Sequence, residues 1–359
     1  MKEIALELKN VKKVFEKDGV SLTAVDDTTL SVEKGELVTF LGPSGCGKTT
    51  TLRMIAGFER PTAGTITFGG KDMTNVPVNK RGIGFVFQNY ALFPHMTIYN
   101  NVAYGLKARK EKPDEIKRKV EEALALVSLS GTENKYPNEL SGGEQQRVAL
   151  ARVIVMDPSL LLMDEPLSNL DAKLRIHMRT EIRRIQKKLG ITCLYVTHDQ
   201  AEALTVSDRI MVMSRGKVEQ IGTPQEIYSS PSSAFVADFI GQANTVECTV
   251  FECSGREVTA VLPTGDRIKG ITREAFAPGD RAILVARPEN ISVGPADEGE
   301  IKAEVVSAIF VGSHIDYELM MGDKLLKASV DFKPDMTLYR AGDRVSVSMD
   351  EKTLVFLSH

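Results

Sequence analysis

The chain has 359 residues, more than one hydrophobic core usually holds, so two domains are expected. Hydrophobic residues make up 42% of it and charged residues 26%, as in ordinary globular proteins. The formal net charge of −3 gives no positive field for a phosphate backbone, which argues against direct nucleic-acid binding.

Cysteine usage and the N-terminal residues bear on the cellular compartment. Neither metal-ligand spacing nor the density of a disulfide scaffold is found among Cys46, Cys193, Cys248 and Cys253, which fits a reducing compartment. The start, MKEIALELKN, lacks the apolar core of a signal peptide, and no apolar run approaches the length of a membrane span. A cytoplasmic chain is predicted, with any membrane role coming through a partner.

The first elements read as a hairpin. Residues 4–15 and 22–32 alternate apolar and polar side chains, as in a half-solvated antiparallel pair. Phe15 is placed where its ring could lie over a base. A lone aromatic residue is more often part of a core, and only the phosphate loop described next favours stacking on adenine.

The stretch from Gly35 to Gly57 predicts a strand, a glycine-rich loop and a helix. Leu37–Leu41 is an apolar run, residues 42–49 fill every fixed position of G-x-x-x-x-G-K-[ST], and a helix runs from Lys48 until Gly57 closes it. The loop glycines let successive N–H groups point inward, and the start of the helix adds its positive dipole end, so a polyphosphate fits.

Nucleotide binding is therefore predicted for this loop. Lys48 is expected to reach the β- and γ-phosphates and Thr49 to hold Mg²⁺. Cys46 could be reactive, but simple packing is favoured. The predicted nucleotide-binding residues of the loop are Gly42, Pro43, Ser44, Gly45, Cys46, Gly47, Lys48, Thr49 and Thr50.

A strand from Ile83 to Phe87 ends at Gln88, whose side chain can ligate Mg²⁺ or hold water when it faces a phosphate site. The composition then changes, and residues 89–140 read as a helical insertion with an amphipathic helix over 113–129. Its aromatic residues form either a small core or a docking surface for another chain, and composition leaves both open: Tyr90, Phe93, Tyr99 and Tyr104.

A second anion-binding helix start follows in LSGGE. Ser141, Gly142 and Gly143 open a helix predicted to run to Met156, with a serine hydroxyl beside its N–H groups. The apolar strand 160–163 then delivers Asp164 and Glu165 at its carboxyl end. Because burying unpaired carboxylates is costly, a structural role is disfavoured. Asp164 suits Mg²⁺, and Glu165 suits polarisation of an attacking water.

The last predicted site residue of this half is His198. A helix from Ala172 to Leu189 follows SNLD, and the buried strand ITCLYVTHD ends at the histidine. This histidine could be a satisfied polar group. At the carboxyl edge of a sheet beside a phosphate site, it is also well placed to bond the γ-phosphate.

In this order, the motifs resemble those of the ATPase subunits of ABC transporters. They are GPSGCGKT, Gln88 in FVFQNYALFPH, LSGGE, Asp164-Glu165, the loop Ser168-Asn169-Leu170-Asp171, and His198. Six motifs in one order over about 160 residues leave little room for chance. The whole chain, with its β-rich tail after about residue 240, is similar to importer ATPases of the maltose, polyamine, ferric-iron and sulfate type. Glu144 departs from the commoner glutamine of the signature.

The resemblance implies an α/β P-loop NTPase domain over 1–240, an ABC ATPase with a RecA-like core and a helical subdomain at about 89–140. An all-β, OB-like barrel over 241–359 would serve dimerisation or regulation. The resemblance also implies a head-to-tail homodimer with two ATP molecules and Mg²⁺ at the interface. One subunit would contribute Lys48, Thr49, Gln88, Glu165 and His198, the other Ser141, Gly142 and Gly143, with Asp171 crossing the interface. Glu144 is also predicted to belong to the nucleotide-binding residues. Catalysis would fall to Glu165, His198 and Gln88, and Mg²⁺ to Thr49, Gln88 and Asp164.

The tail after about Thr245 consists of short alternating segments split by Gly, Asp or Pro, which is typical of a small barrel. Residues 286–293 and 305–319 resemble the OB-type tail of these importers. The tail concentrates no basic and aromatic residues, so subunit pairing, regulation or solute sensing is favoured over nucleic-acid binding.

The resemblance thus implies an ATPase that energises a membrane importer from the cytoplasmic face. Its partners would be a second copy, two transmembrane permeases contacting residues near Asn89–Thr97, and a solute-binding protein. Polyamine or ferric iron is the favoured solute, and sugar or sulfate remains open. An ABC ATPase acting on ribosomes or DNA is the rival, disfavoured by a single phosphate loop and the lack of long heptads. A P-loop kinase would leave the signature helix unexplained.

Overall fold

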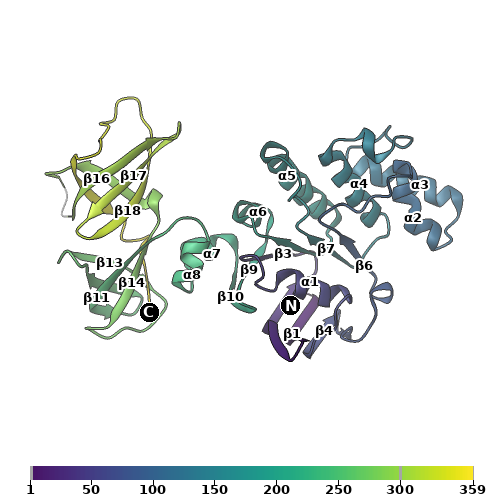
Figure 1. Cartoon of the computed structure of the whole chain (residues 1–359), viewed down its shortest axis with the longest axis horizontal. Helices are drawn as coiled ribbons and strands as arrows, with labels where there is room; N and C mark the ends of the chain where they lie inside the picture. Colours follow the sequence, from purple (N-terminus) through teal and green to yellow (C-terminus); the bar gives the residue numbers. More distant parts are fainter. Residues whose placement is uncertain (1–2, 299–300, 359) are drawn as a thin grey trace. The chain divides into compact units, whose positions relative to one another are not determined.

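The computed structural model describes residues 3–298 and 301–358 (Figure 1). Contacts divide the chain into two compact units, Met1–Pro224 and Gln225–His359. Each unit is described by itself. The sequence predicted that the first domain ends near residue 240, and this boundary of an independently folding domain stays a prediction.

The first unit is built on a six-stranded sheet in the order β10-β9-β3-β8-β7-β6. All neighbouring strands are parallel except β9 and β10. Parallel strands are buried on both faces, which explains why these segments are nearly continuous apolar runs. The strands are β3 (Leu37–Leu41), β6 (Ile83–Val86), β7 (Leu160–Asp164), β8 (Cys193–Thr197), β9 (Arg209–Ser214) and β10 (Lys217–Gly222).

A second, antiparallel sheet in this unit has the order β2-β1-β4-β5. Its strands are β1 (Ile4–Lys17), β2 (Val20–Glu33), β4 (Ala63–Phe68) and β5 (Lys71–Asp72). β1 and β2 form the predicted N-terminal hairpin, with Phe15 opposite Leu22.

The helices of this unit follow the predicted order. They are α1 (Lys48–Ala56), α2 (Ile98–Ala108), α3 (Pro113–Leu126), α4 (Gly142–Ile154), α5 (Ala172–Leu189) and α6 (Gln200–Val206), with 3₁₀ turns η1 (Val78–Lys80) and η2 (Pro137–Glu139). α3 ends three residues before the predicted Leu129, because Val127 leaves the helical conformation and Ser128 is left-handed at φ 58°. α4 ends two residues before the predicted Met156, ahead of a left-handed Asp157.

Two hydrophobic clusters cover the two faces of the six-stranded sheet, because side chains alternate along each strand. Leu161, Met163 and Tyr195 belong to one cluster, and Leu162 and Leu194 belong to the other. The first cluster continues into α2, α3 and α4. It therefore joins the sheet to the predicted helical insertion.

The same cluster shows which role Tyr90 has, core or docking surface, a choice that composition left open. Tyr90 lies in it with only 8% of its surface exposed, and Leu92 packs against it. Tyr104, by contrast, is 49% exposed. Tyr90 is therefore a core residue, while Asn89, Ala91, Pro94 and His95 form the exposed part of the Asn89–Thr97 loop.

The second unit contains a closed barrel and a separate five-stranded sheet, where the sequence predicted one small barrel. The barrel order is β11 (Asn244–Ser254), β12 (Glu257–Val261), β13 (Arg267–Thr272), β20 (Val355–Leu357) and β14 (Arg281–Ala286). The sheet order is β15 (Ile291–Pro295), β19 (Arg344–Met349), β16 (Ile301–Phe310), β17 (His314–Met321) and β18 (Lys324–Asp331). Two short helices precede them, α7 (Pro224–Ser229) and α8 (Ala234–Phe239), and η3 (Pro288–Asn290) joins β14 to β15.

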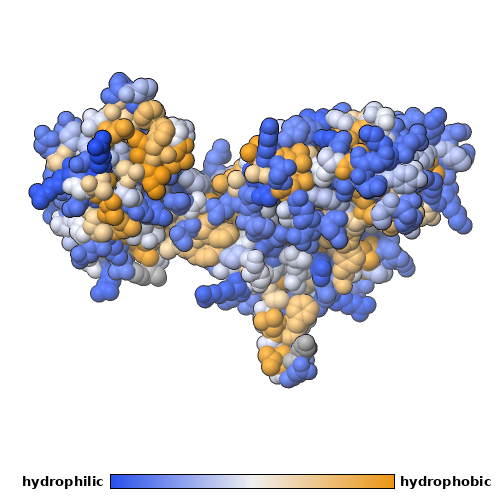
Figure 2. Space-filling model, turned by 45° about the horizontal axis from the view of Figure 1, so that its top comes forward, coloured by the Kyte–Doolittle hydropathy of each residue, from blue (hydrophilic) through white to orange (hydrophobic). Residues whose placement is uncertain are grey.

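The described parts of the chain hold no helix long and apolar enough to span a bilayer. The face shown in Figure 2 is mainly hydrophilic, with apolar patches scattered over it.

Candidate functional site

The loop between β3 and α1 has a backbone that requires glycine. Gly45 and Gly47 have φ values of 78° and 104°, in the left-handed region that L side chains rarely adopt. A Cβ on Gly42 would overlap the carbonyl oxygen of Met213, and one on Gly47 would overlap that of Ala24. Gly47 caps α1 without a side-chain hydrogen bond, so no side chain competes for the first N–H groups of the helix. A helix start of this kind suits an anion.

Lys48 lies across this loop. Its side chain is buried, and Nζ donates to the carbonyl oxygens of Gly42 at 2.7 Å and Pro43 at 2.9 Å. Cys46 is also buried, and burial raises the pKa of its thiol even though Lys48 opposes the shift. This environment agrees with packing rather than reactivity for Cys46. Ser44 is exposed, and Thr49 and Thr50 are half-buried.

Asp164, at the end of β7, meets the loop directly. Thr49 Oγ1 donates to Asp164 Oδ1 at 3.1 Å. Burial raises the pKa of Asp164, and the neighbouring Glu165 charge adds to that effect, while the Thr49 hydrogen bond opposes it. A half-buried carboxylate with a raised pKa and a hydroxyl oxygen beside it form a donor set that fits a hard cation.

Mg²⁺ commonly takes one or two protein oxygens and completes its shell with phosphate oxygens and water. No group of three or more His, Cys, Asp or Glu side chains with metal-binding geometry is present over 3–298 and 301–358. The pair of Thr49 and Asp164 therefore fits an ion shared with a polyphosphate better than one held by the protein alone.

Glu165 and His198 form a second pair beside the first. His198 Nδ1 lies 3.2 Å from Glu165 Oε2, and the histidine side chain is 56% exposed. Glu165 has a left-handed backbone, with φ 44°. It is held there because its N–H donates to Val196 O at 3.0 Å, and its carbonyl accepts from Ser168 N at 3.2 Å and Ser168 Oγ at 3.0 Å.

Gln88 follows β6 and is exposed. Its backbone carbonyl accepts from Asn169 Nδ2 at 3.0 Å, which joins it to the loop that ends at Asp171. Asp171 is the N-cap of α5, and its Oδ1 accepts from Leu174 N at 2.9 Å. The backbone carbonyl of Gln88 is thus hydrogen-bonded to the loop that ends at Asp171. The role of the Gln88 side chain stays a prediction.

The signature segment, residues 140–144 (LSGGE), lies at the start of a helix, α4. Ser141 caps α4 in a reciprocal arrangement, in which Glu144 Oε2 accepts from Ser141 N at 2.8 Å and from Ser141 Oγ at 2.7 Å. Gly142 and Gly143 lie against the side chains of Leu170 and Leu174. Ser141 and Gly142 are exposed, and Ser141 pairs with Glu144 of its own chain, so this face of the segment can be reached by a second molecule.

Phe15 is 38% exposed and lies outside the hydrophobic clusters of the first unit. Lys13 Nζ stands 4.7 Å from the centre of its ring. An exposed ring with a neighbouring cation excludes the simple core alternative for this residue.

A polar network behind His198 was missed by the sequence analysis. Arg175 and Arg179 of α5 reach Asp199 Oδ2 at 3.4 Å and 3.0 Å, and Arg175 also donates to Leu170 O at 3.0 Å. The network therefore ties the residue after His198 to the loop before Asp171. The i, i+4 spacing of the two arginines, on the helix after SNLD, was the signal that could have indicated it.

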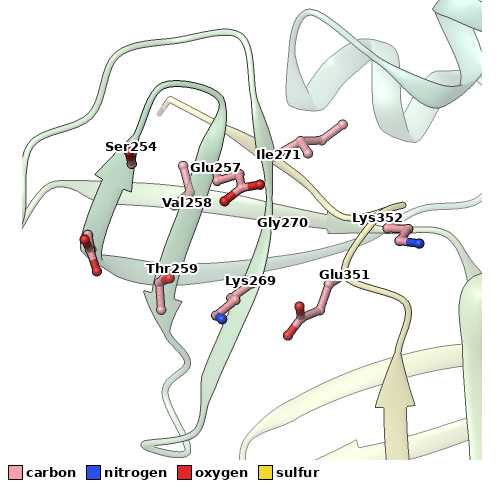
Figure 3. Close-up of a pocket in the computed structure, with 10 residues that line it drawn as sticks. Ser254, Glu257, Val258, Thr259, Lys269, Gly270, Ile271, Glu351 and Lys352 are labelled. Atoms are coloured by element: carbon pink, nitrogen blue, oxygen red, sulfur yellow. The ribbon is translucent and has the colours of Figure 1, made fainter.

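The second unit carries a separate cavity of about 470 Å³ on its barrel (Figure 3). Three carboxylates and two lysines line it, namely Glu252, Glu257, Glu351, Lys269 and Lys352. All five side chains are exposed, and their charges nearly cancel. None of the predicted site residues lines this cavity.

Comparison with known proteins covers both units. Residues 25–168 match the model of the ABC transporter family, and residues 284–357 match that of the TOBE domain. The chain is 51% identical over 302 residues to the Fe(3+) ions import ATP-binding protein FbpC 1 of Rhizobium meliloti, covering 83% of this chain and 84% of that protein. It is 45% identical over 357 residues to the spermidine/putrescine import ATP-binding protein PotA of Rubrobacter xylanophilus, covering 99% and 94%.

Solved structures agree for the first unit. cbiO1 from Clostridium perfringens, part of the ABC transporter complex cbiONQ, superposes with a TM-score of 0.59 at 31% identity, over 63% of this chain and 90% of that one. The ATP-binding cassette MJ0796, in a dimeric post-hydrolysis state bound to ADP and Pi, gives 0.54 at 32% identity, over 61% and 98%. The predicted fold class and ATPase assignment are confirmed, and the chain belongs to the ATP-binding import subunits of ABC transporters.

Proposed function

We propose that two copies of this chain close around two ATP molecules and that hydrolysis reopens them, driving solute import through a membrane permease. The observation that carries this proposal is the convergence of three strand ends. The glycine loop after β3, the Thr49–Asp164 hydrogen bond at β7 and the Glu165–His198 pair beside β8 lie at one edge of the sheet. Ligands of open α/β sheets bind at that edge.

The nucleotide would be held by the glycine loop, residues 42–50. Lys48 exchanges its two loop carbonyl partners for phosphate oxygens, since an ammonium group prefers a charged acceptor. Phe15 contributes an exposed ring for the base. Ser141, Gly142 and Gly143, with Glu144 behind them, would come from the second copy, since α4 presents its start outward, and Asp171 would lie at the same interface.

Thr49 and Asp164 would hold Mg²⁺, with Gln88 as a further ligand. When bound, Mg²⁺ would supply positive charge that neutralises the phosphate group. Asp164 supplies the carboxylate, and Thr49 orients it by donating to Oδ1.

Glu165 would orient and deprotonate the attacking water. Asp164 is engaged with Thr49, whereas the Glu165 carboxylate is one residue further along and is paired with His198. His198 would bond the γ-phosphate, and its imidazole separates from Glu165 when it does so. A carboxylate held on a fixed, left-handed backbone is pre-oriented for this task.

The variant Glu165→Gln tests this assignment, because it keeps the size of the side chain and removes the proton acceptor. We expect ATP binding equal to that of the parent, a longer-lived ATP-bound dimer, and a loss of about two to four powers of ten in turnover. Gel filtration with ATP and phosphate release measure these effects. Near-parental turnover, or no dimer with ATP, would overturn the assignment.

Two further variants separate binding from hydrolysis. Lys48→Ala should weaken ATP binding itself, because it removes the ammonium group that meets the phosphates. His198→Ala should bind ATP and hydrolyse it more slowly, because only the γ-phosphate contact is lost. Equal effects of both variants on ATP affinity would contradict the separate roles.

The permease would contact the exposed part of the Asn89–Thr97 loop, which follows Gln88 directly. This contact would place the subunit on the cytoplasmic face of the membrane, with a solute-binding protein acting on the other side. Since Tyr90 is buried in the core and Leu92 packs against it, the contact would use the exposed residues of the loop, Asn89, Ala91, Pro94 and His95.

Ferric iron is the proposed cargo, because the relatives at 48% to 51% identity include several Fe(3+) ions import proteins. A polyamine is the second candidate, because the PotA relative aligns over 99% of this chain. Uptake of labelled ferric iron and of labelled spermidine should be compared in cells carrying the parent or Lys48→Ala. Loss of iron uptake alone supports the first cargo, and loss of spermidine uptake alone supports the second.

A further inference from the structure

Arg152 lies near the end of α4 and binds backbone that none of the proposed roles uses. Its guanidinium donates from Nη1 to Ala91 O at 2.8 Å and from Nη2 to Tyr90 O at 2.9 Å. The ring of Phe93 lies 5.5 Å from the guanidinium carbon. This contact needs a planar guanidinium group, because its two Nη atoms donate to two neighbouring carbonyl groups at the same time.

The backbone that Arg152 holds is strained. Tyr90 and Ala91 have φ values of 60° and 47°, so two successive residues other than glycine are left-handed. The loop is also fixed on both sides of them. Asn169 holds Gln88 O at 3.0 Å, and Asn101 accepts from Phe93 N at 2.8 Å and donates to Phe93 O at 3.1 Å.

α4 connects this loop to the signature segment. The helix is continuous from Gly142 to Ile154 and is capped by Ser141, eleven residues before Arg152. At 1.5 Å per residue, the two ends are about 16 Å apart on one rigid element. A shift of the Gln88 loop would therefore be transmitted through Arg152 to one end of α4 and would move Ser141 at the other end.

We propose that Arg152 is a positioning residue that couples the two nucleotide sites of the closed dimer. The loop after Gln88 senses the site on its own subunit, and α4 carries that shift to the signature segment, which serves the opposite site. This inference rests on the proposed function, in which Gln88 and Ser141 of one chain belong to different sites. The coupling requires both hydrogen bonds from the Arg152 guanidinium, because a single hydrogen bond would let α4 rotate relative to the loop.

The experiment measures ATP-dependent dimerisation in full-length Glu165→Gln protein, with and without a change at Arg152. Arg152→Gln should raise the ATP concentration for half-maximal dimerisation at least about tenfold, within the range of typical coupling between sites. ATP affinity of the monomer, measured with a fluorescent nucleotide, should change less than about twofold. Arg152→Lys, which reaches one carbonyl group, should be intermediate.

Arg109→Gln is the matched control. Arg109 also donates to a backbone carbonyl near the end of α4, Met156 O at 3.3 Å, but it holds no part of the Gln88 loop. It should dimerise like the parent. Equal losses for Arg109→Gln and Arg152→Gln would overturn the proposal.

Ala91→Gly separates coupling from simple loop support, because glycine adopts this backbone without strain. Added to Arg152→Gln, it should restore the thermal unfolding midpoint and leave dimerisation weak, since the link to α4 is still missing. Recovery of both would mean that Arg152 only supports the loop, and the proposal would fail. If Glu165→Gln alone forms no dimer, the proposed function itself fails, and this is seen before Arg152 is changed.

Discussion

At the scale of single residues, Glu144 is the departure with the clearest consequence. Its carboxylate accepts hydrogen bonds from both the backbone N–H and the side-chain hydroxyl of Ser141. These hydrogen bonds hold the pKa of Glu144 below its usual range, so the group is charged at neutral pH. A negative charge beside a segment proposed to meet a phosphate opposes dimer closure.

Glu144→Gln should therefore favour closure. The amide oxygen can still accept from Ser141 N, but the charge is gone. We expect about 3- to 10-fold tighter ATP-dependent dimerisation, and a loss of up to about 1 kcal/mol in the free energy of unfolding, because an acidic group at a helix start is stabilising. Gel filtration and urea denaturation measure the two effects. Weaker dimerisation would contradict the prediction.

Asp164 gives a pH dependence of known sign. Since its pKa is raised, mainly by burial, the charged form is less stable in the folded than in the unfolded state. The residue therefore costs stability at neutral pH, and that cost is removed as pH falls through the raised pKa. The proposed Mg²⁺ binding would have the opposite pH dependence, because it needs the charged carboxylate and would weaken as pH falls.

Asp164→Asn should raise the free energy of unfolding of the metal-free protein at pH 7 by about 0.5 to 2 kcal/mol, as often follows removal of a functional charge. It should also lose most of the Mg²⁺ dependence of ATP binding. Urea denaturation without nucleotide and Mg²⁺ titration with ATP check the two parts. A destabilised variant would show that Asp164 is structural.

At the scale of elements, α1 depends on a buried arginine outside it. Arg81 is 4% exposed, and Nη1 donates to Met54 O at 2.8 Å and Ile55 O at 2.7 Å, which are carbonyls of the last turn of α1. Nε donates to Val76 O at 2.7 Å. A cation here donates to the last carbonyl groups of the helix and lies at the negative end of its dipole.

Arg81→Gln should cost about 2 to 4 kcal/mol of unfolding free energy, since several buried acceptors lose their donor together. Arg60→Gln, an exposed site just after the same helix, should change it by less than about 0.5 kcal/mol. The urea midpoints of the two variants provide the comparison. Similar midpoints would mean that water replaces the guanidinium.

The elements also show what sequence reasoning could reach. The hairpin, the glycine loop, α4, α5 and the strands that lead to Asp164 and His198 follow local patterns, so they were predictable. Arg81, Arg152 and Asn169 were not, because their acceptors are backbone carbonyls distant in sequence, and a carbonyl leaves no trace in the sequence. The two sheets of the tail were missed for a related reason: β13 pairs with β20, placing Ile271 opposite Val355.

At the scale of the whole molecule, helix α8 packs with strands of the second unit. Ala237 of α8 belongs with Val285, Val355 and Leu357 of the second unit. Arg287 Nη1 donates to Ala237 O at 2.7 Å, and its Nη2 donates to Tyr228 O at 3.0 Å. The helices α7 and α8 therefore depend on the second unit for their packing.

A chain ending at Pro224 should therefore behave better than one ending at Gly241. We expect the shorter fragment to be soluble, to bind ATP within about threefold of the parent, and to dimerise less readily without nucleotide. The longer fragment exposes the Ala237 face and should be less soluble. Nucleotide binding and gel filtration compare them, and a nucleotide-blind 1–224 fragment would show that the tail completes the catalytic fold.

The position of β3 in the sheet has a consequence during synthesis. Its five residues are fully buried, yet its neighbours are β8 and β9, and Leu37 pairs with Cys193, 156 residues further along the chain. A ribosome adding about 5 to 20 residues per second needs about 8 to 30 s to supply that partner. For this interval LVTFL emerges as an unpaired, aggregation-prone segment. The yield of folded protein in a cell therefore depends on translation speed and chaperone supply as well as on the stability of the finished fold.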